Sequence, residues 1–339
     1  MSQPLLTIAI PTYNRSANLA LLLGMIAPQL KDLGEIELLI SDNASLDDTE
    51  EVVRRYLTCG LRCTYIRNQT NIGPDGNFLQ CYFQAAGKYF WLFGDDDVIF
   101  PGALASIVRC LNRQEVDLVY LAPFGFVHSP NERQKANPSP VVFAFSDPCA
   151  FVHAVGLRGD FALISGIIVN KTRVESFSHA DFAEGRDTNL LQLGWTFTSL
   201  RNFRQGLVFE RGLFAVCEYK PQRKFDVVRV FGVNWFRLAQ KYLEGTPAVL
   251  STILDDQLYS WFPTNWYGMR RKPEHTRIVN PVRQMRPLYG NRLFFWVFTW
   301  PLLVLPMPLA GAWLAAVRGI RHIDRFLNRH LRPSLPSLD

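Results

Sequence analysis

Between residues 5 and 93, short apolar runs rich in β-forming residues alternate with segments whose apolar residues recur at helical spacing. The expected strands lie at 5–10, 36–40, 63–66 and 89–93, and the expected helices at 17–26, 45–56 and 76–86. We expect Ser16 to cap the first helix and a capping box, Ser45-x-x-Asp48, to open the second. Strands that alternate with helices predict a doubly wound α/β fold.

Polar residues follow three of these strands, at the positions where such sheets bind ligands. They are Pro11-Thr12-Tyr13, Asp42-Asn43 and Asp95-Asp96-Asp97. The G-x-G-x-x-G fingerprint of dinucleotide enzymes is missing after the first strand, and the sequence contains no G-x-x-x-x-G-K-[ST] phosphate loop. The sequence therefore predicts a nucleotide diphosphate that is held through a metal ion and side chains instead of a glycine cradle.

Asp95, Asp96 and Asp97 form a run of three carboxylates directly after an apolar segment. Their mutual repulsion disfavours ionisation unless a cation or strong hydrogen-bond donors lie among them. Mg²⁺ and Mn²⁺ prefer oxygen ligands and often bind one or two carboxylates together with phosphate oxygens. The run indicates a metal–diphosphate site, with a solvated turn as the alternative because Gly-Asp opens many turns.

Several motifs follow one another over residues 5–115. They read Thr7-Ile8-Ala9-Ile10-Pro11-Thr12-Tyr13-Asn14-Arg15, Ile40-Ser41-Asp42-Asn43-Ala44-Ser45, Asn71-Ile72-Gly73, and Ala86-Gly87-Lys88-Tyr89 leading to Asp95-Asp96-Asp97 and Pro101. In this order and spacing they resemble the family-2 inverting glycosyltransferases of GT-A fold. The version Phe93-Gly94-Asp95-Asp96-Asp97 looks most like the abequosyltransferase-like branch, which builds bacterial O-antigens.

The resemblance implies a nucleotide site at the first two strand ends. Pro11 and Tyr13 would line the pocket for the nucleotide base, and Asp42 would accept a hydrogen bond from the base or ribose. Asn71 would belong to the same nucleotide-binding site. The alternatives from the residues alone are that Asp42 is a turn or cap residue and that Tyr13 is an ordinary half-buried aromatic.

The resemblance also implies roles for the acidic run. Asp95 would contact the ribose or the metal, while Asp96 and Asp97 would hold Mg²⁺ or Mn²⁺ against the diphosphate. Many family members have an aspartate where this chain has Gly94, so the division of labour among the three carboxylates stays open. The segment Pro74-Asp75-Gly76-Asn77-Phe78 stands where many members have a basic residue.

An inverting transfer needs a general base that takes the proton from the acceptor hydroxyl. The candidates are Asp187 and Glu184, which flank Gly185-Arg186 before an apolar helix expected at 190–200. In the family the base often comes from an acidic pair at the start of such a helix, and Asp187 fits that position best. The alternative is that Asp187 or Thr188 caps the helix. Further strands are expected at 116–121 and 163–169, the latter carrying Ser165-Gly166 on the acceptor side of the cleft.

No charged residue occurs between Leu293 and Val317, a run that is long enough to span a bilayer. Pro301, Pro306 and Pro308 interrupt it, since each interior proline removes a helical hydrogen bond. A broken or re-entrant membrane segment, a straight span and a buried pair of core helices are therefore all compatible with the run.

The C-terminal tail has the pattern of a basic amphipathic helix. Arginines recur on one face and apolar residues on the other: Arg318, Arg321, Arg325, Arg329 and Arg332 against Ile320, Ile323, Phe326, Leu327 and Leu331. Such a helix suits an anionic membrane interface on the cytoplasmic side. It accounts for much of the net charge of +6 without nucleic acid, for which no basic groove with stacked aromatics is evident.

These patterns predict a GT-A domain at 1–225, a helical aromatic-rich extension at 226–290, and a hydrophobic segment with a basic tail at 291–339. The cysteines show no C-x-x-C spacing and read as reduced thiols, and no secretory signal is expected at the N-terminus.

The hypothesis is a metal-dependent glycosyltransferase at the cytoplasmic face of the cell membrane. It would move a sugar from a nucleotide-diphospho-sugar to a lipid-linked, polyprenyl-diphosphate saccharide. The alternatives are a sugar-nucleotide pyrophosphorylase and a non-catalytic membrane-bound saccharide-binding scaffold.

Overall fold

The computed structural model describes residues 3–126, 140–174, 182, 185–210, 212–217, 223–271 and 276–330. The chain divides into two compact units. The sheet unit comprises Met1–Ser146 and Ala162–Tyr219 with the last residues of the chain, and the helical unit comprises Asp147–Phe161 and Lys220–Pro333. The predicted boundaries at 225/226 and 290/291 stay predictions.

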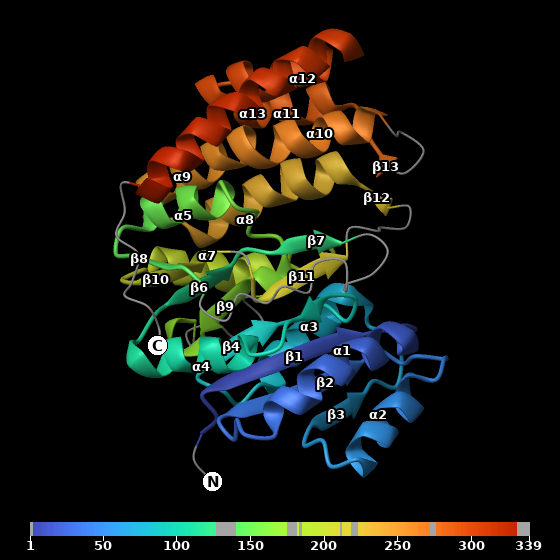
Figure 1. The fold of residues 1–339 in the computed structure, drawn as a ribbon. Helices are drawn as coiled ribbons and strands as arrows, with labels where there is room; N and C mark the ends of the chain where they lie inside the picture. The colour runs from blue at the N-terminus through green and yellow to red at the C-terminus, as the bar shows by residue number, and fades with distance from the viewer. Residues whose placement is uncertain are drawn as a thin grey trace. The chain divides into compact units, whose positions relative to one another are not determined.

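The sheet unit is built on an eight-stranded mixed sheet with the order β3-β2-β1-β4-β9-β6-β10-β8 (Figure 1). The first four strands are parallel, β9 is antiparallel to both of its neighbours, and β8 is antiparallel to β10. The strands are β1 Leu6–Thr12, β2 Ile36–Asp42, β3 Thr64–Arg67, β4 Tyr89–Leu92, β6 Leu118–Leu121, β8 Val142–Phe145, β9 Ile167–Asn170 and β10 Gly206–Phe209.

A smaller sheet has the order β5-β11-β7, with strands β5 Val98–Ile99, β11 Phe214–Cys217 and β7 Phe124–Phe126. It begins directly after the acidic run, because β5 starts one residue beyond Asp97. Strand β11 is antiparallel to β5 and parallel to β7. The acidic run therefore lies between strand β4 of the large sheet and strand β5 of the small one.

The helices of the sheet unit connect its strands. They are α1 Ser16–Leu30, α2 Thr49–Thr58, α3 Gly73–Gln84, α4 Ala103–Arg113 and α7 Gln192–Arg201, with 3-10 turns η2 Ile164–Gly166 and η3 Lys171–Arg173. Helices α3 and α7 meet through Tyr82 and Trp195, whose rings stack with centroids 5.1 Å apart. This contact packs the C-terminal half of α3 against α7.

Both predicted N-caps are wrong. Ser16 is the first residue of α1 and its backbone N–H donates to Asp47 at 2.9 Å, so the cap comes from another loop. Ser45 does not open α2; its hydroxyl accepts the N–H of Asn14 at 2.9 Å, and Asp48 makes no side-chain cap. The side chains bind across two loops instead of along one helix, which sequence spacing does not reveal.

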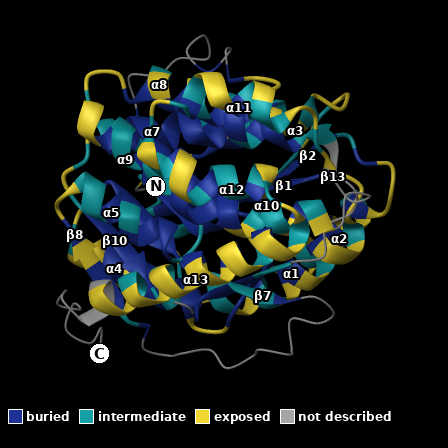
Figure 2. Ribbon diagram, turned by 90° about the horizontal axis from the view of Figure 1, so that it is seen from above, coloured by how far each residue is buried: buried dark blue, intermediate teal, exposed yellow. Residues whose placement is uncertain are grey.

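The helical unit contains α5 Pro148–Gly156, α8 Trp235–Tyr242, α9 Pro247–Asp256, α10 Phe262–Arg271, α11 Pro281–Tyr289, α12 Trp300–Val304 and α13 Met307–His330. Three π-helical turns, η4 Arg229–Asn234, η5 Gln257–Trp261 and η7 Phe295–Thr299, and two short paired strands, β12 Arg223–Asp226 and β13 Thr276–Arg277, complete it. Large aromatic side chains fill its core, among them Trp235, Trp266, Tyr242 and Tyr289. Figure 2 colours the buried residues of the helices and strands dark blue.

The uncharged run 293–317 is broken in the structure. It forms η7 and α12, stops at Leu305 in extended backbone before Pro306, and resumes as α13. No helix among the described residues combines the length and apolar character needed to cross a membrane. All six cysteines are free of disulfide bonds.

On α13, Arg321 and Arg325 turn inward, whereas Arg318 is exposed. The predicted positions Leu331 and Arg332 lie outside the described residues, and so does the side chain of Arg329. Arg321 and Arg325 donate to backbone carbonyls of Gly156, Leu157 and Ser260 within the helical unit. Ile320, Ile323, Phe326 and Leu327 are exposed on the other side.

Candidate active site

The carboxyl ends of β1, β2 and β4 meet at one edge of the large sheet, as the sequence predicts. Thr12 pairs with Asp42 across β1 and β2, and Ala9 pairs with Leu92 across β1 and β4. A cavity of about 300 Å³ lies at this edge. It brings together five predicted site residues: Pro11, Tyr13, Asn71, Asp95 and Asp96.

Two carboxylates in this cavity converge on one cation. Nη1 of Arg15 lies 2.9 Å from Oδ1 of Asp95 and 2.8 Å from Oδ2 of Asp96. Burial raises the pKa of Asp95 to about 6, the charge of Asp96 adds to the rise, and the Arg15 guanidinium opposes it. Arg15 stands inside the first motif, but sequence reasoning assigned it no role, because an arginine after a strand is common on its own.

The convergence of Asp95 and Asp96 fits a divalent cation, since two carboxylate oxygens already lie around one positive nitrogen. Within the described residues, no cluster of three or more His, Cys, Asp or Glu side chains is placed to hold a metal. Mg²⁺ and Mn²⁺ commonly take one or two protein carboxylates and complete their shell with phosphate oxygens and water. The residues present therefore suit a cation that binds together with a diphosphate.

Asp97 points away from this cavity. Its carboxylate accepts the Ser165 hydroxyl at 2.6 Å and the backbone N–H of Cys217 at 3.1 Å, and the residue is only 6% exposed. The Ser165 hydroxyl also accepts the N–H of Gly94 at 2.8 Å. Ser165 thus ties the two ends of the acidic run together, while the predicted metal role of Asp97 stays a prediction.

Asp42 lies beneath the cavity and is fully buried. Its Oδ1 accepts the N–H of Ser45 at 2.8 Å, and its Oδ2 accepts the Tyr65 hydroxyl at 2.7 Å with Nε of Arg67 at 3.5 Å. Desolvation and the nearby carboxylate raise the pKa of Tyr65. Asp42 therefore holds the loop after β2 in place, and its predicted contact with the base or ribose stays a prediction.

Asn43, the next residue, lines the cavity. The sequence placed it with Asp42 at this strand end but assigned it no role of its own. Its Nδ2 donates to Oδ1 of Asn71 at 2.9 Å and to the carbonyl of Gly73 at 3.1 Å, and its Oδ1 accepts the N–H of Ile72 at 2.9 Å. Asn43 therefore fixes the Asn71-Ile72-Gly73 turn against the end of β2. The sequence offered one signal for this contact: Asn43 and Asn71 each stand between a strand and the helix that follows it.

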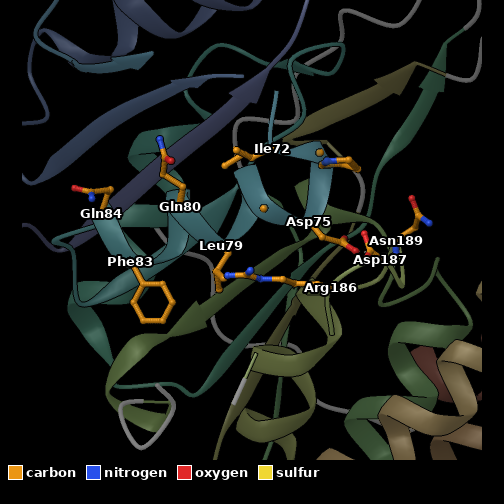
Figure 3. A pocket seen from close by; sticks show the side chains of 12 residues that line it. Ile72, Asp75, Leu79, Gln80, Phe83, Gln84, Arg186, Asp187 and Asn189 are labelled. Atoms are coloured by element: carbon orange, nitrogen blue, oxygen red, sulfur yellow. Dashed lines mark hydrogen bonds between the residues drawn. The ribbon is translucent and has the colours of Figure 1, made fainter. Parts of the chain in front are cut away.

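Asp187 lines a second cavity, of about 630 Å³, between α3 and the segment before α7 (Figure 3). Its backbone adopts φ 61°, a left-handed conformation that is uncommon for a residue with a side chain. Neither Asp187 nor Thr188 caps α7, which begins at Gln192; the Thr188 hydroxyl instead accepts the N–H of Leu190 at 3.2 Å. Glu184, the other predicted base, lies outside the described residues.

Asp75 anchors the Asp187 segment to the first turn of α3. It is 5% exposed, and its Oδ2 accepts the N–H of Asn189 at 3.0 Å. Burial raises the pKa of Asp75 to about 6, against the hydrogen bonds from Asn189 and Leu191. Pro74, the preceding residue, lines both cavities. The start of α3 therefore connects the cavity at the sheet edge to the segment that carries the predicted base.

Residues 7–165 match the model of the family described as Glycosyl transferase family 2. Among curated proteins, abequosyltransferase RfbV of Salmonella typhimurium is 42% identical over 111 residues, which cover 32% of this chain and 33% of the relative. GalNAc(5)-diNAcBac-PP-undecaprenol beta-1,3-glucosyltransferase of Campylobacter jejuni is 34% identical over 110 residues, 32% of this chain and 35% of the relative. The matches span about a third of the length of these relatives.

Solved structures extend the likeness of fold to nearly the whole chain. S. aureus TarS 1-349 in complex with UDP-GlcNAc superposes with a TM-score of 0.61 at 15% identity, covering 97% of this chain and 92% of that one. Mannosyltransferase PcManGT from Pyrobaculum calidifontis, in complex with GDP-Man and Mn²⁺, gives a TM-score of 0.52 at 14% identity, covering 96% and 89%. The fold is the α/β GT-A-like glycosyltransferase fold.

Proposed function

We propose that this protein is a metal-dependent, inverting glycosyltransferase that moves a sugar from a nucleotide-diphospho-sugar to a lipid-linked, polyprenyl-diphosphate saccharide during bacterial surface polysaccharide synthesis. The observation that carries the proposal is the cavity at the sheet edge, where Asp95 and Asp96 converge on Arg15. The name of the Campylobacter relative supports the acceptor class. The UDP-GlcNAc and GDP-Man complexes support the donor class.

Each part of the cavity has a role in this proposal. Pro11 and Tyr13 flank the nucleotide base, and Asn43 holds Asn71 against the nucleotide. Asp95 and Asp96 would hold Mg²⁺ or Mn²⁺, and Asp97, the third carboxylate of the acidic run, stays a predicted ligand. The cation would stabilise the negative charge that develops on the departing diphosphate.

Asp187 is the proposed general base, with Glu184 as the second candidate. A carboxylate within hydrogen-bond reach of the acceptor hydroxyl takes its proton as the oxygen attacks the anomeric carbon of the donor sugar. The bond to the diphosphate breaks on the opposite face, so the configuration inverts. The anchor between Asp75 and Asn189 supports this role, because it fixes the position of the Asp187 segment relative to α3.

The proposed location is the cytoplasmic face of the cell membrane. Exposed apolar residues on α13 and the charge of the helical unit support a membrane partner. The helical unit contains 19 Lys and Arg against 8 Asp and Glu, a net charge of +11, whereas the rest of the chain carries 17 against 22, a net charge of −5. Anionic lipid attracts such a cationic unit.

The donor site is tested by calorimetric titration of the full chain with UDP, dTDP, CDP and GDP, with and without Mn²⁺. We expect one nucleotide to bind in a metal-dependent manner, and Asp96→Asn to abolish this binding. Asp48→Asn is the matched control, because Asp48 is exposed and lies outside the cavity. If no nucleotide binds the wild type under either condition, the transferase proposal fails and a non-catalytic scaffold replaces it.

The base is tested separately, by single-turnover transfer with Asp187→Asn. We expect nucleotide binding to persist in this variant while transfer falls by about 10²–10⁴-fold, the usual contribution of general base catalysis. Transfer at the wild-type rate would exclude Asp187 as the base and leave Glu184 as the candidate.

A further inference from the structure

The helical unit has a cavity of its own, of about 390 Å³, between the end of α5, the start of α10 and α13. Four arginines and a histidine line it: Arg158, Arg318, Arg321, Arg325 and His322. One carboxylate, Asp160, also lines it. The expected role of the α13 arginines was contact with a membrane surface, and this concave arrangement was not predicted from the sequence.

Arg321 forms the wall of this cavity and is held by neutral groups. Its Nη1 donates to the carbonyl of Ser260 at 3.0 Å and to the Thr264 hydroxyl at 2.8 Å, and its Nη2 donates to the carbonyl of Gly156 at 3.3 Å. Within the part of the chain that the structure describes, Arg321 makes no ion pair with a carboxylate. Its charge is therefore positioned by the fold and is not neutralised by a direct contact.

The neighbouring charges make this an electropositive site. Burial lowers the pKa of Arg321, and the charges of Arg325 and Arg318 lower it further, while Asp256 opposes them. Asp256 itself lies 3.5 Å from His153, so it faces another partner as well. Like charges gathered around a concave space are stabilised when an anion enters it.

The opposite face of α13 indicates where such an anion comes from. Ile320 is 49% exposed, Ile323 61% and Leu327 48%, so an apolar stripe runs along the same helix that lines the cavity. A helix with a cationic pocket on one face and an exposed apolar stripe on the other is typical of a segment that lies in an anionic lipid surface, where phosphate groups surround it. A free anion in solution would make no use of the stripe.

We propose that the cavity between α5, α10 and α13 is a binding site for a phosphate group, and that this phosphate is carried by a lipid. Arg318 and His322, which are exposed at the rim, contact the phosphate oxygens, and Arg321 supplies the fixed charge at the wall. Arginine suits this role because its guanidinium donates two parallel hydrogen bonds to phosphate. The site is separate from the sheet-edge cavity and does not depend on the transferase reaction.

The test measures two probes with the full chain. One is sodium pyrophosphate, followed by calorimetry without divalent metal, and the other is phosphatidylcholine vesicles with or without phosphatidylglycerol, followed by co-sedimentation. Arg318→Gln is compared with Arg283→Gln, which removes the same charge from an exposed position on α11. Both variants keep the sheet-edge cavity, so any binding of pyrophosphate there is common to the two. His322→Gln serves in place of Arg318→Gln if thermal unfolding shows that the latter is destabilised.

We expect Arg318→Gln to weaken binding to phosphatidylglycerol vesicles by about tenfold, because it removes one charged hydrogen-bonding group. Arg283→Gln should leave this binding within about twofold of wild type. Equal losses in both variants would show that only overall charge matters and would overturn the site. Absence of binding to both probes would also overturn it. If Arg318→Gln weakens pyrophosphate binding but no vesicle binds, the phosphate site stands and its lipid source is wrong.

Discussion

Asp42 shows how a single carboxylate can serve a site without lining it. It is fully buried under the sheet-edge cavity, and its two oxygens accept hydrogen bonds from Ser45 and Tyr65. A buried carboxylate that loses a donor keeps its desolvation cost without the compensating bond. The donors of Asp42 are therefore as important to the loop after β2 as Asp42 itself.

Tyr65→Phe is expected to lower the free energy of unfolding by about 1.5–3 kcal/mol, the usual contribution of a hydrogen bond to a charged group. The measurement is urea denaturation followed by far-UV circular dichroism. Tyr13→Phe is the matched control, because Tyr13 is 41% exposed and removal of its hydroxyl leaves no buried acceptor. Equal stability of Tyr65→Phe and wild type would show that water replaces the tyrosine at Asp42.

Asp75 makes stability depend on pH. Its pKa is raised from 3.8 to about 6 by burial, so between these values the folded chain holds a proton that the unfolded chain has released. The contribution of Asp75 to the free energy of unfolding is therefore greatest at low pH and is lost as the pH rises through about 6. Asp75→Asn removes the ionisation while keeping an acceptor for Asn189.

We expect Asp75→Asn to match wild type near pH 4 and to exceed its free energy of unfolding by about 2–3 kcal/mol near pH 8, at about 1.4 kcal/mol for each unit of pKa. Urea denaturation at both values measures the difference. A gain of the same size at both pH values would mean that the pKa of Asp75 does not rise on folding, contrary to its burial.

The sequence predicted which residues gather at the sheet edge better than it predicted where their side chains point. Pro11, Tyr13 and Asn71 reach the cavity because strand and turn positions alone place them there. The orientations of Asp42 and Asp97 depend on partners that are distant in the sequence, Tyr65 and Cys217, and no local pattern encodes these contacts.

At the scale of elements, alternating apolar runs located every strand of the parallel half of the sheet. The observed strand ends differ from the expected ones by up to two residues; β2, for example, continues to Asp42. The mixed order on the other side of β4 was not predicted, because antiparallel β9 arrives from much later in the chain. Helix α3 begins at Gly73 instead of Gly76, since Asn43 stabilises the turn before it.

The start of β4 is packed so closely on β1 that the position between α3 and β4 requires glycine. A Cβ atom on Gly87 would lie 2.6 Å from the backbone nitrogen of Thr7 and 2.7 Å from its hydroxyl. The Gly87 N–H also donates to that hydroxyl at 2.8 Å. A side chain here must therefore push β1 and β4 apart at their first residues.

Gly87→Ala is expected to lower the free energy of unfolding by about 1–3 kcal/mol, as overpacking of a core does. Gly34→Ala is the matched control, because a Cβ atom there meets nothing within 4 Å. Thermal and urea unfolding of the two variants give the comparison. If Gly87→Ala were no less stable than Gly34→Ala, β1 and β4 would have to separate at Gly87 and Thr7 without a cost in free energy.

At the scale of the whole molecule, the moderate net charge of +6 conceals a strong division. The helical unit carries +11 and the remainder −5, as counted from the sequence over the two units. The sequence predicted an amphipathic α13 but not which face would be buried, because arginine stems and apolar side chains both pack against aromatic cores. The structure turns the half-buried Arg321 toward the helical unit and exposes Ile323, so a membrane would meet apolar side chains with Arg321 behind them.

This arrangement predicts two separable contributions to binding of anionic vesicles. The charge of the helical unit acts through solvent and is screened, since the Debye length falls from about 10 Å at 0.1 M salt to about 3 Å at 1 M. Insertion of the apolar stripe is not screened. Leu327→Ser should therefore lower binding about tenfold at both salt concentrations, as expected for loss of a buried leucine contributing about 1.5–3 kcal/mol.

Co-sedimentation of the full chain with phosphatidylglycerol vesicles at both salt concentrations measures this. Leu46→Ser is the matched control, because Leu46 is 88% exposed and belongs to the sheet unit. Wild type should bind more weakly at high salt than at low salt, with Leu46→Ser following it closely and Leu327→Ser lying below both throughout. If Leu327→Ser instead followed wild type at both salt concentrations, charge alone would attach the protein, and the exposed face of α13 would have to be covered by something other than a bilayer.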